Sequence, residues 1–420
     1  MERVTADYLI ETPFPLEDVA AMMAGEQSSG TFVRVAGETD ELRARSAAQV
    51  LDIEDLGEVE EPSLTSAYIA RKGAPGPYRR ARVRIAFPVG NIGKNLPTLA
   101  ATVSGNLYDL GEVTGLKLLN VTIPAEYRAR YPRPAQGIAG TRSSLGVQGR
   151  PIFGTIIKPN VGMTPEAIAA LVADLCAAGV DFIKDDEICA NPDVAPLAQR
   201  VPLVMEAIKR AEDTSGRRVM MAFNITDETD AMRRHADLVA QHGGTCVMAS
   251  LNWCGLSAME TLRAHTPLAI HGHRNGFGAM SRHPALGMAF PAYQALYRLA
   301  GVDHMHVHGI GGKFVDSAEE VTEAARACLA PLAEGADDAV MPAFSSGQWA
   351  GTLGSALEAA GSADLMFMCG GGILAHPGGP AAGIASLRDA YEALSEGESL
   401  AQAAANRPAL AAALDFFGSR

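Results

Sequence analysis

Four consecutive charged residues, Lys184, Asp185, Asp186 and Glu187, end the mostly apolar stretch Gly179–Glu187. Because side chains alternate along a strand, we expect Lys184 and Asp186 on one face and Asp185 on the other. Glu187, where the strand should turn into a loop, can swing back towards Asp186. Two carboxylates suit an oxygen-loving dication such as Mg²⁺, and a lysine converted by CO₂ into a carbamate would supply a third oxygen ligand. A solvated charge run is the alternative, because such runs are common on surfaces.

The elements that would position this cluster form a regular series from Ile152 onward, in which an apolar strand is followed by an amphipathic helix eight times. Eight such units over about 260 residues are the count and length of a TIM (β/α)8 barrel. An open, doubly wound sheet is the alternative, but the first unit lacks a GxGxxG turn. The expected strands are Ile152–Ile157, Asp181–Lys184, Val219–Asn224, Cys246–Ser250, Leu268–His271, His304–His306, Ala339–Phe344 and Leu365–Cys369. The expected helices begin near Thr164, Val201, Asp230, Leu256, Pro291, Ser317, Gly351 and Ala381.

The first part of the chain, up to about residue 130, shows a different pattern, in which short strands and helices mix in α+β fashion. The predicted strands are Tyr8–Ile10, Thr31–Val35 and Ala81–Phe87, and the predicted helices are Leu16–Met23 and Pro97–Ser104. The paired prolines of Tyr131–Gly137 resist both a helix and a central strand. We therefore expect an N-terminal α+β domain over residues 1–132 and a barrel domain over residues 133–420.

Side chains capable of chemistry collect at the carboxyl ends of the expected barrel strands, where TIM barrels place their active sites. They are Lys158, Asn160, Lys184–Glu187, Asn224, Asn252, His271–Arg274, His304, His306, His308, Gly309–Lys313, Ser345–Gly347 and Gly370–Gly372. A surface charge run does not explain so many neighbouring strands that end in such groups. Their position therefore favours a metal site at Asp186 and Glu187.

Three glycine-containing loops follow the later strands. Ser345–Gly347 and Gly370–Gly372 follow the seventh and eighth strands, where TIM barrels often bind phosphate through backbone N–H groups; ordinary tight turns are the alternative. Gly309–Lys313 is not a P-loop, because Phe314 follows the lysine and the glycine spacing differs. It is better explained as a flexible lid that brings Lys313 onto a substrate, with a surface lysine on a mobile turn as the alternative.

Histidines gather at the expected fifth and sixth strands. They are His271, His273, His304, His306 and His308. Packed, hydrogen-bonded core histidines are the plain explanation, and those that face inward are candidate general acids or bases. A zinc site is the third option, but carboxylates beside a lysine favour Mg²⁺. Lys158 is a second candidate base, since a nearby cation favours its neutral form. A metal beside a base suits proton abstraction next to the carbonyl of a phosphorylated substrate, because the metal stabilises the enolate oxygen.

The bulk composition excludes several classes of protein. The formal charge of −13 argues against a nucleic-acid partner or a polybasic membrane contact. No apolar run reaches the length of a membrane span, and the first residues lack a signal-peptide pattern. The six cysteines are scattered without a CxxC pair, which favours reduced thiols over a disulfide framework or a zinc site. We expect a soluble, cytoplasmic protein.

Taken in order, the motifs resemble those of ribulose bisphosphate carboxylase (RuBisCO) large chains and the RuBisCO-like proteins, over nearly the whole chain. The segments that carry the resemblance are Gly154–Pro159, Gly179–Glu187, His273-Arg274, Asp303–His306 and Gly312-Lys313. The resemblance implies a TIM barrel with a smaller, ferredoxin-like N-terminal domain. It also implies one Mg²⁺ per subunit, with carbamylated Lys184, Asp186 and Glu187 as its ligands.

The same resemblance implies roles for further residues. The implied catalytic residues are Lys158, His273, His306 and Lys313. The implied substrate and phosphate contacts are Arg274, Ser345, Gly347, Gly370 and Gly371. In the N-terminal domain, Glu26–Thr31 and Gly105-Asn106 resemble segments that complete a neighbouring subunit's site, which implies contacts from Glu26, Thr31 and Asn106 and at least a homodimer.

The chain departs from the carboxylase pattern at several of these motifs. Asn160 stands where the carboxylase has a second lysine, and Phe32 stands where it has tryptophan. Ser346 replaces a glycine, and His308–Gly311 replaces the usual lid sequence. The changes on the phosphate side suggest a substrate with one phosphate, other than ribulose 1,5-bisphosphate. The chain therefore resembles the RuBisCO-like, form IV branch and not the CO₂-fixing enzymes.

Lys313 bears on the reaction. In the carboxylase the matching lysine faces the incoming carboxylate, and a pure enolase has little need of it. We therefore expect decarboxylation of a phosphorylated 3-oxo sugar acid, such as 3-oxo-isoapionate 4-phosphate in carbohydrate catabolism. The alternative is an enolase or isomerase of a methylthio-ketose phosphate, such as 5-methylthioribulose 1-phosphate in methionine salvage. A true carboxylase and a non-catalytic stress or interaction protein are less favoured.

Overall fold

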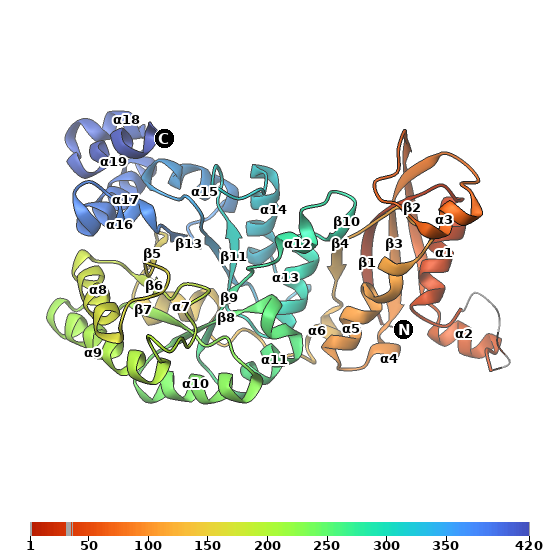
Figure 1. Cartoon of the computed structure of the whole chain (residues 1–420), viewed down its shortest axis with the longest axis horizontal. Helices are drawn as coiled ribbons and strands as arrows, with labels where there is room; N and C mark the ends of the chain where they lie inside the picture. Colours follow the sequence, from red (N-terminus) through yellow and green to blue (C-terminus); the bar gives the residue numbers. More distant parts are fainter. Residues whose placement is uncertain (1, 31–34, 36, 420) are drawn as a thin grey trace. The chain divides into compact units, whose positions relative to one another are not determined.

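The computed structural model describes residues 2–30, 35 and 37–419, which form two compact units (Figure 1). Unit 1 comprises the chain up to Pro132 together with Gly276–Ala300 and Pro331–Asp337. Unit 2 comprises Arg133–Asn275, Gly301–Ala330 and the chain from Asp338 onward. Unit 1 therefore includes two segments that lie within the barrel part of the sequence.

Unit 1 is built on a five-stranded sheet in the order β10-β4-β1-β3-β2. Its strands are β1 (Arg3–Thr12), β2 (Gln49–Val59), β3 (Tyr78–Pro88), β4 (Gly115–Thr122) and β10 (Leu286–Met288). All pairs are antiparallel except β10 with β4, which is parallel. With helices α1 (Leu16–Glu26) and α5 (Leu96–Val103), strands β1 to β4 follow the β-α-β-β-α-β order of a ferredoxin-like domain. This confirms the predicted N-terminal fold.

The sheet of unit 1 has one buried face because apolar residues alternate along its strands. In β1, Ala6, Tyr8 and Ile10 are fully buried, while the residues between them are partly exposed. On the outer face, arginines of β3 meet acids of the neighbouring strands, as in the 2.6 Å contact of Arg84 Nε with Asp7 Oδ1. Such cross-strand pairs help to fix the register.

Four of the five elements predicted in the N-terminal part of the chain are confirmed. The strands predicted at residues 8–10 and 81–87 lie within β1 and β3, and the predicted helices overlap α1 and α5. Of the strand predicted at residues 31–35, only Val35 is described. Strands β2 and β4 were not predicted, because β2 is an exposed strand rich in acids and the apolar run of β4 does not alternate. The other helices of unit 1 are α2 (Asp40–Ser46), α3 (Ala67–Lys72), α4 (Val89–Ile92), α6 (Ala125–Arg128), α12 (Gly278–Ser281) and α13 (Phe290–Leu299).

Unit 2 contains a closed barrel of parallel strands, which confirms the predicted TIM barrel. The strands are β5 (Ile152–Ile156), β6 (Phe182–Lys184), β7 (Met220–Asn224), β8 (Cys246–Ser250), β9 (Ala269–His273), β11 (His304–His308), β12 (Met341–Phe344) and β13 (Met366–Met368). Each strand pairs with the next one along the barrel, and β13 pairs with β5 to close it. Each overlaps a predicted strand.

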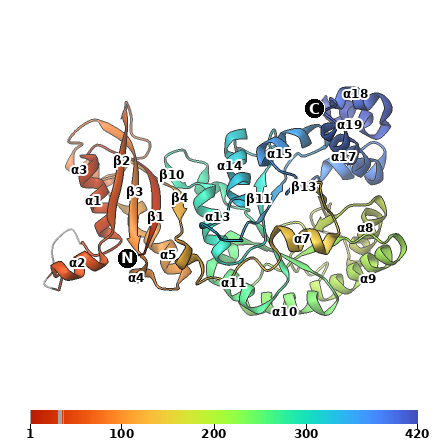
Figure 2. The same ribbon diagram turned by 180° about the vertical axis from the view of Figure 1, so that it is seen from behind.

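Helices of unit 2 lie around the barrel (Figure 2). They are α7 (Gly137–Leu145), α8 (Pro165–Ala178), α9 (Leu197–Ser215), α10 (Thr229–Gln241), α11 (Leu251–His265), α14 (Ala318–Leu329), α15 (Leu353–Ala360), α16 (Gly371–Leu374), α17 (Gly379–Ser395), α18 (Leu400–Ala403) and α19 (Pro408–Gly418). Capping residues set their starts: Thr164 accepts a hydrogen bond from the Ala167 N–H, and Ser317 forms a capping box with Glu320. The helix predicted near Pro291 is α13, which belongs to unit 1 and packs against β4 and α5.

The interior of the barrel is filled by apolar side chains, many of them methionines. The buried core consists of Leu145, Val147, Ile152, Phe182, Met220, Ala222, Cys246, Met248, Ala269, Met341, Ala343, Met366 and Met368. Methionine is unbranched and flexible, so it fills irregular gaps. Gly154 on β5 makes room for this packing, because a Cβ there would collide with the sulfur of Met368.

Two further expectations concern cysteines and membranes. All six cysteines are free thiols, and five of them are buried, in keeping with the expected reduced state. Within residues 2–30, 35 and 37–419, no helix combines the length and the apolar character needed to cross a bilayer.

Asp303 fastens the N-terminal end of β11 to its surroundings. Its Oδ1 accepts hydrogen bonds from the backbone N–H groups of Gln136 and Gly137, at 2.6 and 2.9 Å. Its Oδ2 accepts from the backbone N–H of Ile270 at 2.8 Å and from Nη1 of Arg263 at 3.0 Å. Asp303 is fully buried and the side chain of Arg263 is 3% exposed. Neither charged side chain can therefore reach solvent if its partner is removed.

We expect Asp303→Asn to lower the free energy of unfolding by about 3 kcal/mol, because it leaves the buried Arg263 guanidinium without its carboxylate. Urea unfolding followed by circular dichroism measures the change. The matched control is Asp213→Asn on α9, an exposed residue 64% accessible at its side chain, which should change stability by less than about 0.5 kcal/mol. Equal effects of the two substitutions would contradict the anchoring role of Asp303.

Candidate active site

The carboxyl ends of the barrel strands bring together most of the barrel residues that the sequence singled out. Parallel strands share one direction, so their ends meet at a single rim of the barrel. Lys158 follows β5, Lys184 ends β6, His273 ends β9, His306 lies near the end of β11, and Ser345 and Gly370 follow β12 and β13. The structure thus gives these side chains a common neighbourhood, and their roles stay predictions.

The acidic cluster lies at the end of β6. Lys184 Nζ lies 3.7 Å from Oε2 of Glu187 and donates a 2.8 Å hydrogen bond to the backbone oxygen of Asp185. Lys158 Nζ donates to Oδ2 of Asp186 at 2.7 Å. Lys184 and Asp186 are buried, whereas the side chains of Lys158 and Glu187 are 40% and 34% exposed. Each carboxylate of the predicted metal site therefore has a lysine beside it.

Asp185 points away from this cluster, as the strand alternation predicted. Its Oδ2 accepts hydrogen bonds from Nη2 of Arg200 and from the backbone N–H of Asn224, both at 2.9 Å. The side-chain amide of Asn224 donates to the backbone oxygens of Asp186 and Glu187, at 3.0 and 3.1 Å. These contacts hold the backbone of the acidic segment in place. Arg200, which comes from α9 and is fully buried, was not predicted from the sequence.

Burial controls the protonation of Lys184. It lowers the pKa of the Lys184 amine, and the carboxylates of Glu187, Asp186 and Asp185 oppose the effect only in part. Loss of the proton makes the amine a nucleophile. A neutral lysine amine is the form that adds to CO₂ to give a carbamate.

The donor set fits Mg²⁺ on one condition. Among the described residues, no group of three or more His, Cys, Asp or Glu side chains is arranged to hold a metal ion. Asp186 and Glu187 stand beside Lys184, whose amine in its charged form would repel a cation. A carbamate on Lys184 would replace that amine by oxygen and complete a set of three oxygen ligands, which Mg²⁺ prefers. The residues therefore fit Mg²⁺ if Lys184 is carbamylated.

His273 faces the same cluster from the end of β9. Its Nδ1 accepts a 3.2 Å hydrogen bond from the backbone N–H of Asn275, so in the neutral ring the proton is on Nε2. That Nε2 lies 3.6 Å from Oε2 of Glu187. Burial and the charge of Lys184 lower the pKa of His273 well below its usual value. His273 is thus a neutral donor directed towards Glu187.

A row of hydrogen-bonded histidines runs through the barrel interior. The contacts are Thr141 Oγ1 to His304 Nε2 at 2.8 Å, His304 Nδ1 to His271 Nδ1 at 3.4 Å, His271 Nε2 to His306 Nε2 at 2.7 Å, and His306 Nδ1 to Ser345 Oγ at 2.9 Å. Burial lowers the pKa of all three rings, and that of His304 to about 4. The three rings are therefore neutral near pH 7.

The direction of this row is fixed at Thr141. The Thr141 hydroxyl donates to the backbone oxygen of Gly137 at 2.5 Å, so its oxygen accepts from Nε2–H of His304. A neutral imidazole has one donor and one acceptor nitrogen. The alternation continues through His271 to His306, whose Nδ1 is then an acceptor. His271 and His304, unlike His306, were predicted only as packed or candidate residues, and their order along the row depends on contacts that no sequence pattern encodes.

The predicted lid packs against the loop after β12. A Cβ at Gly309 would lie 2.7 Å from the backbone oxygen of Ser345, and a Cβ at Gly312 would collide with the backbone oxygen of Ser346. The close approach of the two loops therefore requires glycine at both positions. Lys313 is exposed, with its Nζ 5.4 Å from the ring of the neighbouring phenylalanine. The structure does not bring it into an ion pair with the described carboxylates of the cluster.

The two predicted phosphate loops, Ser345–Gly347 and Gly370–Gly372, lie side by side. A Cβ at Gly372 would approach the backbone oxygen of Gln348 to 2.5 Å, so the loops touch only because that side chain is absent. Ser346 has a φ of 73°, a left-handed conformation that favours glycine. The position therefore keeps a glycine-like backbone although the residue is serine. Phosphate binding by these loops stays a prediction.

The three site residues predicted in the N-terminal domain belong to unit 1. Asn106 Nδ2 donates to Oε1 of Glu26 at 3.1 Å, so these two are brought together. Thr31 lies outside the described residues. Their contribution to a neighbouring subunit's site stays a prediction.

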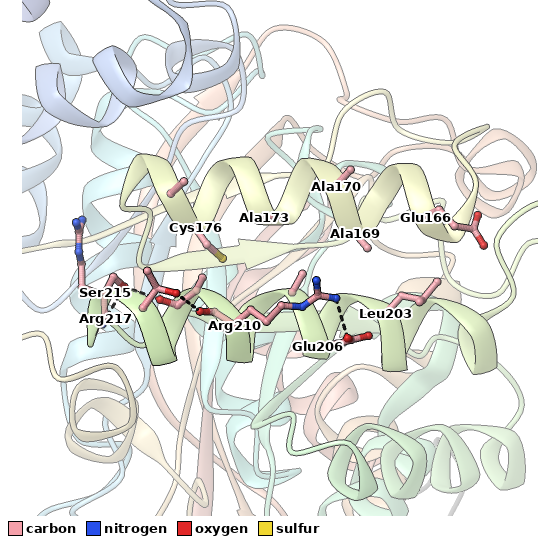
Figure 3. A pocket seen from close by; sticks show the side chains of 14 residues that line it. Glu166, Ala169, Ala170, Ala173, Cys176, Leu203, Glu206, Arg210, Ser215 and Arg217 are labelled. Atoms are coloured by element: carbon pink, nitrogen blue, oxygen red, sulfur yellow. Dashed lines mark hydrogen bonds and ion pairs between the residues drawn. The ribbon is translucent and has the colours of Figure 1, made fainter.

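A groove of about 540 Å³ lies between α8 and α9 (Figure 3). Alanines from both helices line it, together with Cys176 and an ion pair of 2.7 Å between Arg210 and Glu206. None of its lining residues is a predicted site residue. The groove is therefore separate from the candidate active site.

Two family descriptions match the chain. "Ribulose bisphosphate carboxylase large chain, N-terminal domain" matches residues 4–127, and the "catalytic domain" of the same chain matches residues 137–417. Among solved structures, a rubisco-like protein from Burkholderia fungorum is 59% identical with a TM-score of 0.94, over 99% of this chain and 100% of that one. The octameric RuBisCO of Pyrococcus horikoshii is 29% identical with a TM-score of 0.87, over 99% and 93% of the two chains.

Curated relatives extend over the same length. A ribulose bisphosphate carboxylase-like protein of Bordetella bronchiseptica is 50% identical, over 98% of this chain and 97% of that one. The 3-oxo-isoapionate-4-phosphate transcarboxylase/hydrolase of Xanthobacter autotrophicus is 46% identical, over 99% of both chains. The 3-oxo-isoapionate-4-phosphate decarboxylase of Rhizobium rhizogenes is 40% identical, over 99% of this chain and 98% of that one.

The buried histidine row predicts a loss of stability in mild acid. The pKa of His304 falls from 6.5 to about 4 on folding, so between these values the unfolded chain binds a proton that the folded chain does not. The free energy of unfolding therefore decreases as the pH falls through this window, by up to about 3 kcal/mol for His304 alone. Urea unfolding between pH 7.5 and 4.5 measures the slope. His304→Gln should flatten it and substitution of the exposed His242 should not; an unaltered slope in His304→Gln would contradict the assignment.

Proposed function

This chain is a RuBisCO-like protein of the ribulose bisphosphate carboxylase large-chain family, and we propose that it is a Mg²⁺-dependent carbon–carbon lyase. Its substrate would be a phosphorylated 3-oxo sugar acid such as 3-oxo-isoapionate 4-phosphate, from which it removes CO₂. The observation that carries the proposal is the identity of 40–46%, over nearly the whole chain, to proteins named for that substrate. Fold alone would not decide, because one fold hosts many reactions.

The structure of such a substrate defines what a site must supply. When a 3-oxo acid loses CO₂, the electrons of the broken bond pass to C2 and are delocalised onto the 3-oxo oxygen. A 4-phosphate adds a second anionic group at the other end. The site therefore needs positive charge beside the enolate oxygens, a separate pocket for phosphate, and an acid that protonates C2.

The cluster at the end of β6 would provide the positive charge. Asp186, Glu187 and a carbamate on Lys184 would hold one Mg²⁺ per subunit, which when bound stabilises negative charge on the substrate oxygens. Lys158 stands beside this position, with its Nζ between Oδ2 of Asp186 at 2.7 Å and Oδ1 of Asn160 at 2.9 Å. We assign to Lys158 the delivery of a proton to the enolate carbon.

The remaining groups would orient the substrate. His273 presents a neutral Nε2–H on the Glu187 side and can donate to a substrate oxygen. Arg274 is buried at the end of β9 and provides a permanent positive charge for the phosphate. The loops after β12 and β13 add backbone N–H groups. The predicted residues Ser345, Gly347, Gly370 and Gly371 lie in those loops.

Two other reactions compete with simple decarboxylation. The transcarboxylase/hydrolase of Xanthobacter autotrophicus supports one of them. With a hydroxyl on C2 the intermediate would be an enediolate; a proton shift that puts the negative charge on the C2 oxygen would let C3 attack the bound CO₂ and form a new C–C bond. Water would then cleave the bond between C2 and C3 of the new oxo acid. An enolase or isomerase would instead remove a proton beside the carbonyl of a methylthio-ketose phosphate and break no C–C bond. Retention of Lys313 favours the two reactions that break a C–C bond, decarboxylation and transcarboxylation, over the enolase or isomerase.

We also propose a homodimer as the smallest working assembly. The family includes oligomers, as the octameric enzyme of Pyrococcus horikoshii shows. In the proposed dimer, Glu26, Thr31 and Asn106 of one subunit complete the site of the other.

We expect the purified protein, treated with Mg²⁺ and bicarbonate, to release CO₂ from 3-oxo-isoapionate 4-phosphate labelled with ¹³C in its carboxyl group. Lys184→Ala should lower the rate by roughly 10³-fold, because it removes the third oxygen ligand. Lys209→Ala on the exposed face of α9 is the matched control. Mg²⁺ and bicarbonate should raise the melting temperature of the wild type but not that of Lys184→Ala. A non-catalytic protein without a metal site would show no such rise in either form.

The fate of the label separates the alternatives. If the ¹³C label stays in a phosphorylated acid product, the reaction is transcarboxylation and not decarboxylation. Deuterium exchange from solvent into 5-methylthioribulose 1-phosphate, with neither CO₂ release from the oxo acid nor a new labelled acid product, would reject both and establish the enolase.

Lys313→Ala gives an independent test of the reaction class. If C–C cleavage is catalysed, the loss of a cation near the departing carboxylate should lower kcat by roughly 10²-fold or more, with little change in KM. An isomerase should show mainly a higher KM. Separate measurement of kcat and KM distinguishes the two, and Lys313→Arg, which keeps the charge, should recover part of the rate.

A further inference from the structure

Asp316 stands at the far end of the lid loop, directly before α14, and its carboxylate turns back towards the rim of the barrel. Its Oδ2 contacts Nδ1 of His308, the last residue of β11, and lies 3.4 Å from Nη2 of Arg274. The side chain of Asp316 is 18% exposed and that of Arg274 is 2% exposed. One carboxylate oxygen thus joins the end of the lid to the ends of two barrel strands.

Arg274 is held in position by its backbone as well as by this contact. It follows His273 at the end of β9, and its backbone oxygen lies 3.4 Å from the side-chain amide of Asn252, which donates to it. A guanidinium keeps its charge at all physiological pH values, and a buried charge needs an anionic partner. In the structure Asp316 supplies negative charge at the place where the proposed substrate would bring its phosphate.

The lid is short and fastened at its near end. The backbone oxygen of His308 accepts from the Ser345 N–H at 3.0 Å, and the ring of His308 lies 4.5 Å from that of Phe314. His308 also has a φ of 64°, in the left-handed region, which turns the chain sharply into the loop. Lys313 lies three residues before Asp316 and is exposed. Because only two residues separate Lys313 from Asp316, a movement of Asp316 away from Arg274 would also move Lys313.

A phosphate and Asp316 cannot share Arg274 without a cost. Two anions within a few ångströms of one another in a poorly solvated site repel strongly, and the repulsion grows with burial. A dianionic phosphate that pairs with Arg274 must therefore displace the carboxylate. Displacement also frees the end of the lid.

We propose that Asp316 is a specificity-determining and positioning residue whose carboxylate competes with the substrate's phosphate for Arg274, so that phosphate binding releases the lid and lets Lys313 reach the site. The inference rests on the proposed function in one respect, the use of Arg274 as part of the phosphate pocket. A ligand without an anionic group at that place leaves Asp316 on Arg274 and Lys313 exposed. The lid would then assemble the catalytic groups only over a phosphorylated substrate.

Calorimetric titration of the full-length protein with inorganic phosphate tests the competition without any turnover. Asp316→Asn keeps the shape of the side chain and removes its charge, so it should bind phosphate roughly tenfold more tightly than the wild type. Asp316→Glu should bind like the wild type. Asp213→Asn, which makes the same charge change on exposed α9, should also leave the affinity unchanged. Asp316→Ser carries the same expectation as Asp316→Asn if the latter folds poorly.

Arg274→Gln identifies the partner in the competition. In that background Asp316→Asn should give no further gain in phosphate affinity, because the cation for which the two anions compete is absent. Unchanged or weaker phosphate binding by Asp316→Asn, no phosphate binding by either protein, or a gain that persists without Arg274 would each overturn the inference. The absence of CO₂ release from the oxo acid would reject the proposed function and leave the phosphate result intact.

Discussion

The burial of one lysine among carboxylates is the constraint on which the barrel rim depends. Strand alternation turns Lys184 and Asp186 towards one side of β6 and sends Asp185 to the other, where Arg200 and a backbone N–H receive it. Without that outer anchor, the strand end would carry four adjacent charged residues, and Asp185 would be buried without its cationic partner. On the inner side lie the Lys184 amine, whose pKa burial lowers, and the carboxylates of Asp186 and Glu187. Lys158 and His273 lie against this arrangement, through Asp186 and Glu187 respectively.

Much of the architecture was predictable because its signals are local. Each barrel strand is a short apolar run that precedes an amphipathic helix, and the repeat of this unit fixes the fold and the places of the strand ends. The same logic put Lys158, Lys184 and His273 at one rim. For the pair formed by Asp186 and Asp185, alternation alone assigned the correct faces.

What could not be predicted depends on contacts between distant parts of the chain. Arg200 looks like any arginine on an amphipathic helix until the fold sets it against Asp185. No sequence pattern around Asp316 indicates that it pairs with Arg274. Helix α13 has the sequence pattern of a barrel helix, but its buried faces pack within unit 1. In these cases the partner is chosen by the tertiary structure, which a single local pattern does not encode.

The row of histidines has a consequence for the orientation of the substrate. Its hydrogen bonds all donate in one direction, from Ser345 through the three histidines and Thr141 to the carbonyl of Gly137. The Ser345 hydroxyl therefore donates its only hydrogen to His306. The Ser345 oxygen then meets a ligand with lone pairs alone: it can receive a hydrogen bond from an alcohol but has none to give to a phosphate or carboxylate. In the proposed complex, the hydroxylated part of the sugar acid would therefore face Ser345, and its anionic groups would pair with Arg274 and backbone N–H groups. In that complex, a threonine at one end of the barrel core would set which end of the substrate faces Ser345 at the opposite rim.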